Sequence, residues 1–358
     1  MIPLLQPTLA TDQILQSIKR VLDSRFIAEG PIAAELEQAL YDFVGREVAL
    51  VNSCTSAITI AATMIGIQPG DEVISTPMTC IATNSPFVLA GATIRWADID
   101  PETGNISANS VNKLITPKTK CVVCVWWSGM PPSDFDQLQN ICAYHKIPLV
   151  IDAAHAIDSR FDGIPVAKCG DYVCFSFQAV KHLTTGDGGA LACKDIERAR
   201  RLRWFGVDRK LPGRFEQDIP EVGYKFHMND IAAAIGLTML RSLPAILATH
   251  RSTTRLYDEK ISNPKITKLA RSARSDSACW VYSMRVKERE AFSQFMTENG
   301  VQTGRLHVRN DTYSCFARFR AEQLPGVDVF DRELIHIPAG PHLFQIDKNE
   351  IIDLVNAF

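Results

Sequence analysis

Short apolar runs rich in β-branched residues recur along the first part of the chain, between about residues 47 and 192. Between them lie segments such as 136–145, in which apolar residues recur at helical spacing. This alternation is typical of βαβ units, and it predicts a largely parallel sheet covered by helices. The predicted strands are Val48–Val51, Glu72–Thr76, Ala92–Trp96, Cys121–Trp126, Pro148–Asp152, Tyr172–Phe175 and Ala190–Ala192.

The pattern changes beyond about residue 240. A helix-prone stretch covers Leu243–Ile261, an alternating strand covers Trp280–Val286, and a further helical pattern covers Glu290–Glu298. Separate helices and strands of this kind indicate a small α+β domain, joined here without a Pro/Ser-rich linker. We therefore predict a large α/β domain over residues 1–240, which includes an N-terminal helical segment, and a small C-terminal α+β domain over residues 241–358.

Composition narrows the classes of function. The chain has 358 residues, of which 46% are apolar and 22% charged, and a formal net charge of −2. It therefore has no electrostatic bias toward nucleic acid or an anionic membrane. Its ten cysteines are scattered, and several lie in predicted strands, so we expect neither a disulfide framework nor a metal site. With no signal-peptide pattern at the amino terminus, we expect a cytoplasmic protein whose partners are small molecules or copies of itself.

Asp152 ends the apolar run Pro148–Ile151, which is predicted to be a buried parallel strand. Ligands bind at the carboxyl ends of such strands. A carboxylate there can hold a pyridine nitrogen protonated, as pyridoxal phosphate chemistry requires, although an aspartate at a strand-to-helix turn is also a common helix cap. His155 follows three residues later, close enough in a tight turn to reach the same cofactor ring.

Lys181 follows the predicted strand 172–175 and Ser176, and the glycine-rich segment Gly186–Gly189 comes shortly after it. The glycines let the chain turn tightly around a ligand. A lysine amine that forms a Schiff base, set downstream of a carboxylate at a strand end, is the pair that pyridoxal phosphate enzymes require. A lysine in a solvated loop is the alternative, but the apolar strand and the glycine-rich turn favour a site.

A phosphate site is predicted at the segment Asn52–Ala57, which places small hydroxyl residues between a strand and the helical pattern 58–64. Helix N-termini bind phosphate through their backbone N–H groups and the helix dipole. Serine and threonine caps also begin many helices that bind nothing. The position of this segment at the end of a strand is what favours a phosphate site.

These residues and the motifs around them resemble the DegT/DnrJ/EryC1/StrS family of pyridoxal phosphate-dependent sugar aminotransferases over essentially the whole chain. The resemblance is strongest at Asp152–Ala156 and at Ser176–Gly189. So many motifs in the same order are not expected by chance. The further matching segments are Phe26–Pro31, Gly70–Ile74, Asp98–Asp100, Leu202–Gly206 and Gly223–Gly236.

The resemblance implies a fold-type I enzyme whose large domain binds pyridoxal phosphate and which works as a homodimer with active sites at the subunit interface. It implies that Lys181 forms the internal aldimine and that Asp152 partners the ring nitrogen. His155 replaces a glutamine that relatives frequently place beside the ring. Phosphate contacts are implied for Thr55, Ser56 and Ser176, and for Lys225 of the neighbouring subunit.

Two positions depart from the family pattern. Cys80 stands where many relatives place an aromatic residue over the cofactor face. As a cofactor neighbour, Cys80 would have a smaller contact with the ring than an aromatic side chain has. The segment Val125–Gly129 replaces a His-Gly-Gly type sequence that is common in the family. The sequence therefore does not define the shape of the part of the site that would bind the amino acceptor.

The reaction predicted from these features is a ping-pong transamination. Glutamate is the expected amino donor, and a keto sugar carried on a nucleotide diphosphate is the expected acceptor. A sugar dehydratase is one alternative, but related dehydratases have histidine at the position of Lys181. A non-catalytic regulator of the same fold is another, and the presence of both Lys181 and Asp152 argues against it. The nucleotide, amination at carbon 3 or carbon 4, and a keto-cyclitol acceptor all stay open.

The segment Gly304–Asp311 gathers cations and hydrogen-bonding groups beside an apolar run. Arginine pairs bidentately with carboxylates and phosphates, which makes this segment a candidate for binding the donor or the diphosphate. A solvated loop with an ion pair to Asp311 is the alternative. The candidate substrate residues are Arg305, His307 and Arg309.

Overall fold

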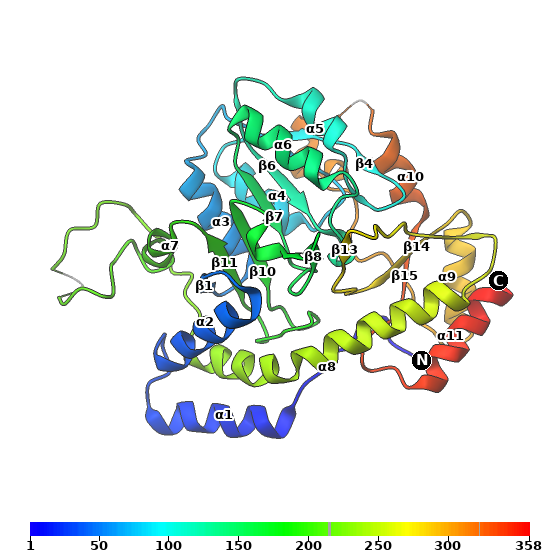
Figure 1. Cartoon of the computed structure of the whole chain (residues 1–358), viewed down its shortest axis with the longest axis horizontal. Helices are drawn as coiled ribbons and strands as arrows, with labels where there is room; N and C mark the ends of the chain where they lie inside the picture. Colours follow the sequence, from blue (N-terminus) through cyan, green and yellow to red (C-terminus); the bar gives the residue numbers. More distant parts are fainter. Residues whose placement is uncertain (214–215, 322) are drawn as a thin grey trace.

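The computed structural model describes residues 1–213, 216–321 and 323–358. Its centre is a seven-stranded sheet with the order β1-β11-β10-β7-β6-β2-β3 (Figure 1). Each strand agrees with a predicted run to within two residues at either end. The strands are β1 (Val48–Val51), β2 (Glu72–Ser75), β3 (Thr93–Trp96), β6 (Thr119–Val125), β7 (Leu149–Asp152), β10 (Tyr172–Ser176) and β11 (Gly189–Cys193).

The central sheet is mixed but mostly parallel. Strands β10, β7, β6, β2 and β3 run parallel to one another, whereas β11 pairs antiparallel with both β1 and β10. This arrangement confirms the predicted α/β architecture. Because parallel strands end at the same edge of a sheet, Asp152 and Ser176, the last residues of β7 and β10, lie at one edge.

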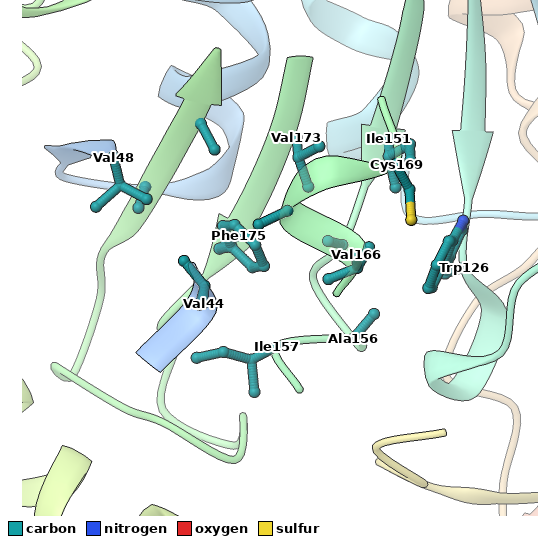
Figure 2. Close-up of a cluster of buried hydrophobic side chains, with 14 of the residues drawn as sticks. Val44, Val48, Trp126, Ile151, Ala156, Ile157, Val166, Cys169, Val173 and Phe175 are labelled. Carbon is teal, nitrogen blue, oxygen red and sulfur yellow. The ribbon is translucent and has the colours of Figure 1, made fainter. Parts of the chain in front are cut away.

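The helices are α1 (Thr11–Ser24), α2 (Pro31–Val44), α3 (Cys54–Ile65), α4 (Ile81–Leu89), α5 (Ala108–Leu114), α6 (Phe135–His145), α7 (Ile196–Leu202), α8 (Asp230–Lys260), α9 (Arg289–Glu298), α10 (Pro325–Glu333) and α11 (Gln345–Ala357). Helices α2, α5, α6 and α8 contribute to the hydrophobic cluster on one face of the central sheet, and α3, α4 and α7 to the cluster on the other. Figure 2 shows part of the first cluster, where Val173 and Phe175 of β10 lie near Val44 at the end of α2. Because both faces are covered, the strands have continuous apolar sequences.

Helix α8 packs along α1 and α2 (Figure 1). It begins well before the predicted start at Leu243 because Asn229 caps it, with Asn229 Oδ1 accepting a hydrogen bond of 2.9 Å from the Ala232 N–H. By length and apolar composition alone, α8 could span a membrane. However, Leu243 and Leu247 are buried in the first hydrophobic cluster, as in the core helix of a folded domain. The helix runs unbroken through residues 240 and 241, and the predicted division into two domains at this point stays a prediction.

The C-terminal part of the chain has its own antiparallel sheet, formed by β12 (Ile266–Lys268), β14 (Tyr282–Val286) and β15 (Leu334–Ile337). Residues of α9, α11 and the end of α8 complete a third hydrophobic cluster around it. Strand β14 begins two residues later than the predicted strand 280–286, so Trp280 lies just before it. The remaining strands are β4 (Ile99–Asp100), β5 (Asn105–Ile106), β8 (Arg160–Phe161), β9 (Ile164–Pro165) and β13 (Ser275–Asp276).

Candidate active site

A cavity of about 440 Å³ opens at the carboxyl edge of the parallel strands. It is lined by the start of α3, the ends of β7 and β10, the segment before α4, and residues of the C-terminal part. A larger depression of about 1030 Å³ lies at the opposite, amino edge and contains none of the predicted site residues. The predicted residues that line the first cavity are Thr55, Cys80, Asp152, His155, Ser176, Lys181 and His307.

Asp152 is buried at the end of β7, with 5% of its surface exposed. Its Oδ2 accepts a hydrogen bond of 2.7 Å from Thr83 Oγ1, and its Oδ1 accepts one of 3.0 Å from the Ala154 N–H. Burial raises the pKa of Asp152, while these two hydrogen bonds and the nearby Lys181 oppose the rise. The donors therefore favour the ionised carboxylate that a protonated pyridine nitrogen needs as its partner.

Lys181, in the loop after β10, lines the same cavity. Its Nζ lies 3.2 Å from the centroid of the Trp280 ring, a contact that stabilises an ammonium group. Trp280 Nε1 donates a hydrogen bond of 2.8 Å to the carbonyl of Val180 and so fixes the backbone next to the lysine. Burial lowers the pKa of Lys181 to about 7, although Asp152 acts in the opposite direction. About half of the amine is therefore neutral at pH 7, which is the form that a nucleophile needs.

His155 packs against two other aromatic rings at the cavity wall, tilted against Trp280 and parallel to His307. Its centroid lies 4.1 Å from that of Trp280 and 5.6 Å from that of His307, with interplanar angles of 30° and 3°. Burial lowers the pKa of His155, and it lowers that of His307 to about 3, so both rings are neutral at pH 7. Among the described residues, His155 Nδ1 and His307 Nε2 have no hydrogen-bond partner. Buried polar atoms normally have one, which points to a polar ligand in this cavity.

The start of α3 forms the end of the cavity where a phosphate is expected. Ser53 caps the helix, and its Oγ accepts a hydrogen bond of 3.1 Å from the Ser56 N–H. Ser56 Oγ donates a hydrogen bond of 2.6 Å to Asn52 Oδ1, so this hydroxyl is already bonded within the turn. Thr55 and Ser53 line the cavity, and Ser56 is not among its lining residues. A phosphate contact of Ser56 stays a prediction.

Gly189, the first residue of β11, lets the sheet approach this turn closely. A Cβ at this position would lie 2.6 Å from the Phe175 carbonyl oxygen and 2.7 Å from the Cys54 nitrogen. Such contacts exclude any larger residue unless the backbone moves. The close approach holds the N-terminus of α3 against the cavity, where its first N–H groups and the positive end of the helix dipole suit an anion.

The two arginines predicted to bind substrate lie outside the described cavity lining and form ion pairs. Arg305 Nη1 lies 2.9 Å from Asp331 Oδ1. Arg309 pairs with Asp311 at 2.7 Å and also with Asp328. The pair with Asp311 is the alternative that the sequence left open for this segment. A role of either arginine in substrate binding stays a prediction.

Lys225 is also outside the described lining of this cavity. Its Nζ lies 3.4 Å from the centroid of the Trp204 ring. The sequence resemblance assigned Lys225 to the site of a neighbouring subunit, and one chain by itself does not test that assignment. It therefore stays a prediction.

Trp280 and Thr83 belong to the site but were not predicted to do so. Thr83 lies in the first turn of α4, and no pattern in the sequence indicated that its hydroxyl meets Asp152. Trp280 comes from the C-terminal part of the chain, and only the packing of that part against the loop after β10 brings its ring to Lys181.

These groups fit pyridoxal phosphate. The cavity offers an amine of low pKa at Lys181, a carboxylate at Asp152, an aromatic wall at His155, and the N-terminus of α3 for a phosphate. No group of three or more His, Cys, Asp or Glu side chains suited to a metal ion occurs in the described residues.

Comparisons with known proteins agree with this fit. A model of the DegT/DnrJ/EryC1/StrS aminotransferase family matches residues 9–356. The chain belongs to this family. It is therefore a pyridoxal phosphate-dependent aminotransferase of fold type I, as the resemblance implied.

Solved structures of similar proteins cover nearly the whole fold. Sugar aminotransferase CalS13 from Micromonospora echinospora is 32% identical, with 100% of both chains covered and a TM-score of 0.95. AtS13 from Actinomadura melliaura is 34% identical, with 100% of this chain and 99% of that chain covered and a TM-score of 0.95. Spr1654 from Streptococcus pneumoniae, in its PMP-form, is 26% identical, with 100% of this chain and 98% of that chain covered and a TM-score of 0.93.

Proposed function

We propose that this aminotransferase moves an amino group from glutamate to a keto sugar carried on a nucleotide diphosphate, by a ping-pong reaction. The observation that best supports transamination is that the Lys181 amine, with a pKa of about 7, lies in the same cavity as Asp152. The similarity to CalS13, a sugar aminotransferase, supports a sugar acceptor. Glutamate and the nucleotide are the expectations that the family resemblance provides.

The cofactor, when bound, supplies an electron sink for the carbanion that forms at the donor carbon. Lys181 is the group that we assign to the covalent link and to moving the proton at that carbon, because its amine is both buried and partly neutral at pH 7. Asp152 holds the pyridine nitrogen protonated, and Thr83 holds Asp152 in place. His155, neutral and packed against Trp280, presents a flat wall to the cofactor ring.

The cavity of one chain has few positive charges for anionic substrates. Among its described lining residues Lys181 is the only lysine or arginine, and His155 and His307 are neutral at pH 7. Glutamate brings two carboxylates and a nucleotide sugar brings a diphosphate, and these anions need cationic partners. We therefore propose a homodimer in which a second copy completes the site, with Lys225 reaching the phosphate of the neighbouring subunit.

Half-reaction spectroscopy tests the proposed donor and acceptor. The purified protein loaded with pyridoxal phosphate should lose its visible absorbance when glutamate is added, with release of 2-oxoglutarate. The resulting pyridoxamine form should recover the absorbance when mixed with the correct member of a panel of nucleotide-linked 3-keto and 4-keto sugars.

The matched control is Lys181→Ala, which should show neither the visible band nor turnover because it has no amine to attach the cofactor. Normal activity of Lys181→Ala would refute the assignment of the lysine. Loss of the band with other amino acids but not with glutamate would refute the proposed donor, and recovery with free keto sugars alone would refute the nucleotide-linked acceptor.

A further inference from the structure

A chain of buried hydroxyl groups leads away from Asp152 at the start of α4. Thr83 Oγ1 lies 2.7 Å from Asp152 Oδ2 and 2.8 Å from Thr79 Oγ1. Thr83 is 0% exposed and Thr79 is 2% exposed, so bulk water does not replace either contact. Thr83 lies in the first turn of α4, and Thr79 lies in the loop just before the N-cap residue Cys80.

The hydrogen atoms of this chain have a defined direction when Asp152 is ionised. A carboxylate only accepts hydrogen bonds, so Thr83 must donate its single O–H proton to Asp152. Thr83 must then act as acceptor toward Thr79, which donates. A protonated Asp152 could still accept from Thr83, or donate to it with both hydroxyls reversed, but such neutral hydrogen bonds are weaker than those to a carboxylate. The hydroxyl pair is therefore matched to the charged form of the carboxylate.

Asn310, in the C-terminal part of the chain, fixes the loop that carries Thr79. It is 0% exposed, and its backbone N–H donates a hydrogen bond of 2.8 Å to the Pro77 carbonyl. Its Nδ2 donates to the Thr79 carbonyl at 2.8 Å, and its Oδ1 accepts from Asn84 Nδ2 at 2.8 Å. The position of the Thr79 hydroxyl thus depends on packing of the C-terminal segment against the sheet edge.

We propose that Thr83, oriented by Thr79, is a positioning residue that keeps the Asp152 carboxylate ionised and directed toward the cofactor nitrogen. The inference rests on the proposed role of Asp152. The other close donor to this carboxylate is the Ala154 N–H, because Cys54 Sγ lies farther away, at 3.9 Å. Thr83 therefore supplies the only donor within 3 Å that Oδ2 has among the described residues.

Other titratable groups also surround Asp152. The Lys181 amine favours its ionised form. Cys124 on β6 and Cys174 on β10 are buried, and Cys54 on α3 is half-buried. Desolvation raises the pKa of each thiol, so they carry no charge near neutral pH. Since burial also raises the pKa of Asp152, loss of the Thr83 hydroxyl would leave a larger fraction of the carboxyl group protonated.

The test compares Thr83→Val, which removes the hydroxyl at nearly constant volume, with Thr83→Ser, which keeps it. The affinity of the cofactor-free protein for pyridoxal phosphate is measured by fluorescence titration, and kcat and KM by steady-state assay. Thr83→Val removes a hydrogen bond to a charged group, and this should reduce both the affinity for pyridoxal phosphate and kcat by about 10- to 100-fold. The KM for the amino donor should change little, and Thr83→Ser should stay within about threefold of wild type.

A double-mutant cycle with Asp152→Asn separates positioning from packing. In the Asp152→Asn background, Thr83→Val should change the affinity by less than about threefold, because no carboxylate remains to be kept ionised. Equal losses in both backgrounds would overturn the inference, since Thr83 would then act through packing alone. If Asp152→Asn weakens binding and Thr83→Val does not, the inference fails while the role of Asp152 survives.

Asp152→Asn with wild-type affinity and turnover would instead overturn the role of Asp152 itself. Thr79→Val tests the outer hydroxyl, and we expect a smaller loss of about threefold because the Thr83 proton still reaches Asp152. Wild-type affinity of Thr79→Val would overturn the part assigned to Thr79. If Thr83→Val does not fold, Thr83→Ala supports the same comparison with Thr83→Ser.

Discussion

The Lys181 amine should destabilise the cofactor-free protein at neutral pH. Burial lowers its pKa from 10.5 to about 7, so between these pH values the unfolded chain binds a proton at this position that the folded chain does not. Proton uptake by the unfolded state favours unfolding. Lys181→Met keeps the length of the side chain and removes the amine. We therefore expect the cofactor-free Lys181→Met protein to be more stable than the wild type.

The magnitude follows from the two pKa values. At pH 7 the difference in proton binding corresponds to roughly 4 kcal/mol in favour of unfolding. The contact of Nζ with the Trp280 ring at 3.2 Å and the access of water through the cavity reduce this cost, so we expect a gain of roughly 2–4 kcal/mol for Lys181→Met. The cost is fully present below about pH 7 and disappears as the pH rises toward 10.5. The gain should therefore shrink by about 1 kcal/mol for each pH unit above 7.

Urea denaturation of the cofactor-free proteins at pH 7, 8 and 9 measures this difference, at one protein concentration because dimer formation would add its own free energy. The control is Lys118→Met, a matched substitution at an exposed lysine, which should show no such trend with pH. The reasoning would be refuted if Lys181→Met were less stable than wild type at pH 7. A gain of equal size at pH 7 and pH 9 would refute it as well.

Three further outcomes follow from the same site and its supports. The rate at which the cofactor-free protein attaches pyridoxal phosphate should rise about tenfold per pH unit below pH 7 and level off above it, because only neutral Lys181 reacts, and a stopped-flow profile without this bend would contradict the low pKa. Gly189→Ala should weaken phosphate and pyridoxal phosphate binding by about tenfold, since the added Cβ would lie 2.7 Å from the Cys54 nitrogen and displace the start of α3; unchanged affinity in calorimetric titration would contradict this. Arg203→Met should reduce the free energy of unfolding by about 2–3 kcal/mol because it removes the buried cation that pairs with both Glu29 and Glu37, although Arg209 still pairs with Glu29 at 2.6 Å, and a loss below about 1 kcal/mol in urea would show that these pairs are effectively solvated.

Much of the fold follows from local sequence. The seven central strands could be placed because strands buried on both faces have continuous apolar sequences, and the sheet edge that holds the site could be placed because parallel strands share their carboxyl ends. Asp152 and Ser176 end such strands, and Thr55 lies in the first turn of the helix after another. The start of α8 was missed because its first turns lie within a motif recognised for its family resemblance rather than for its periodicity.

Only the tertiary structure decided which distant side chains meet at that edge. Trp280 reaches Lys181, and Asn310 fixes the loop of Thr79, through contacts between segments about 100 or more residues apart in the chain. Arg309 pairs with Asp311, two residues away, and with Asp328, and local charge alone did not show whether this flexible side chain would meet them or a substrate.

The chemical state of the site also depends on the fold. The sequence determined that Asp152 ends one predicted strand and that Lys181 follows another, because that order is local. The low pKa of Lys181 and the hydrogen bonds that hold Asp152 were decided by burial, which sums the contacts of every element around the cavity. A residue's position in the chain fixes the group that is available, whereas its surroundings in the fold fix the charge that this group carries.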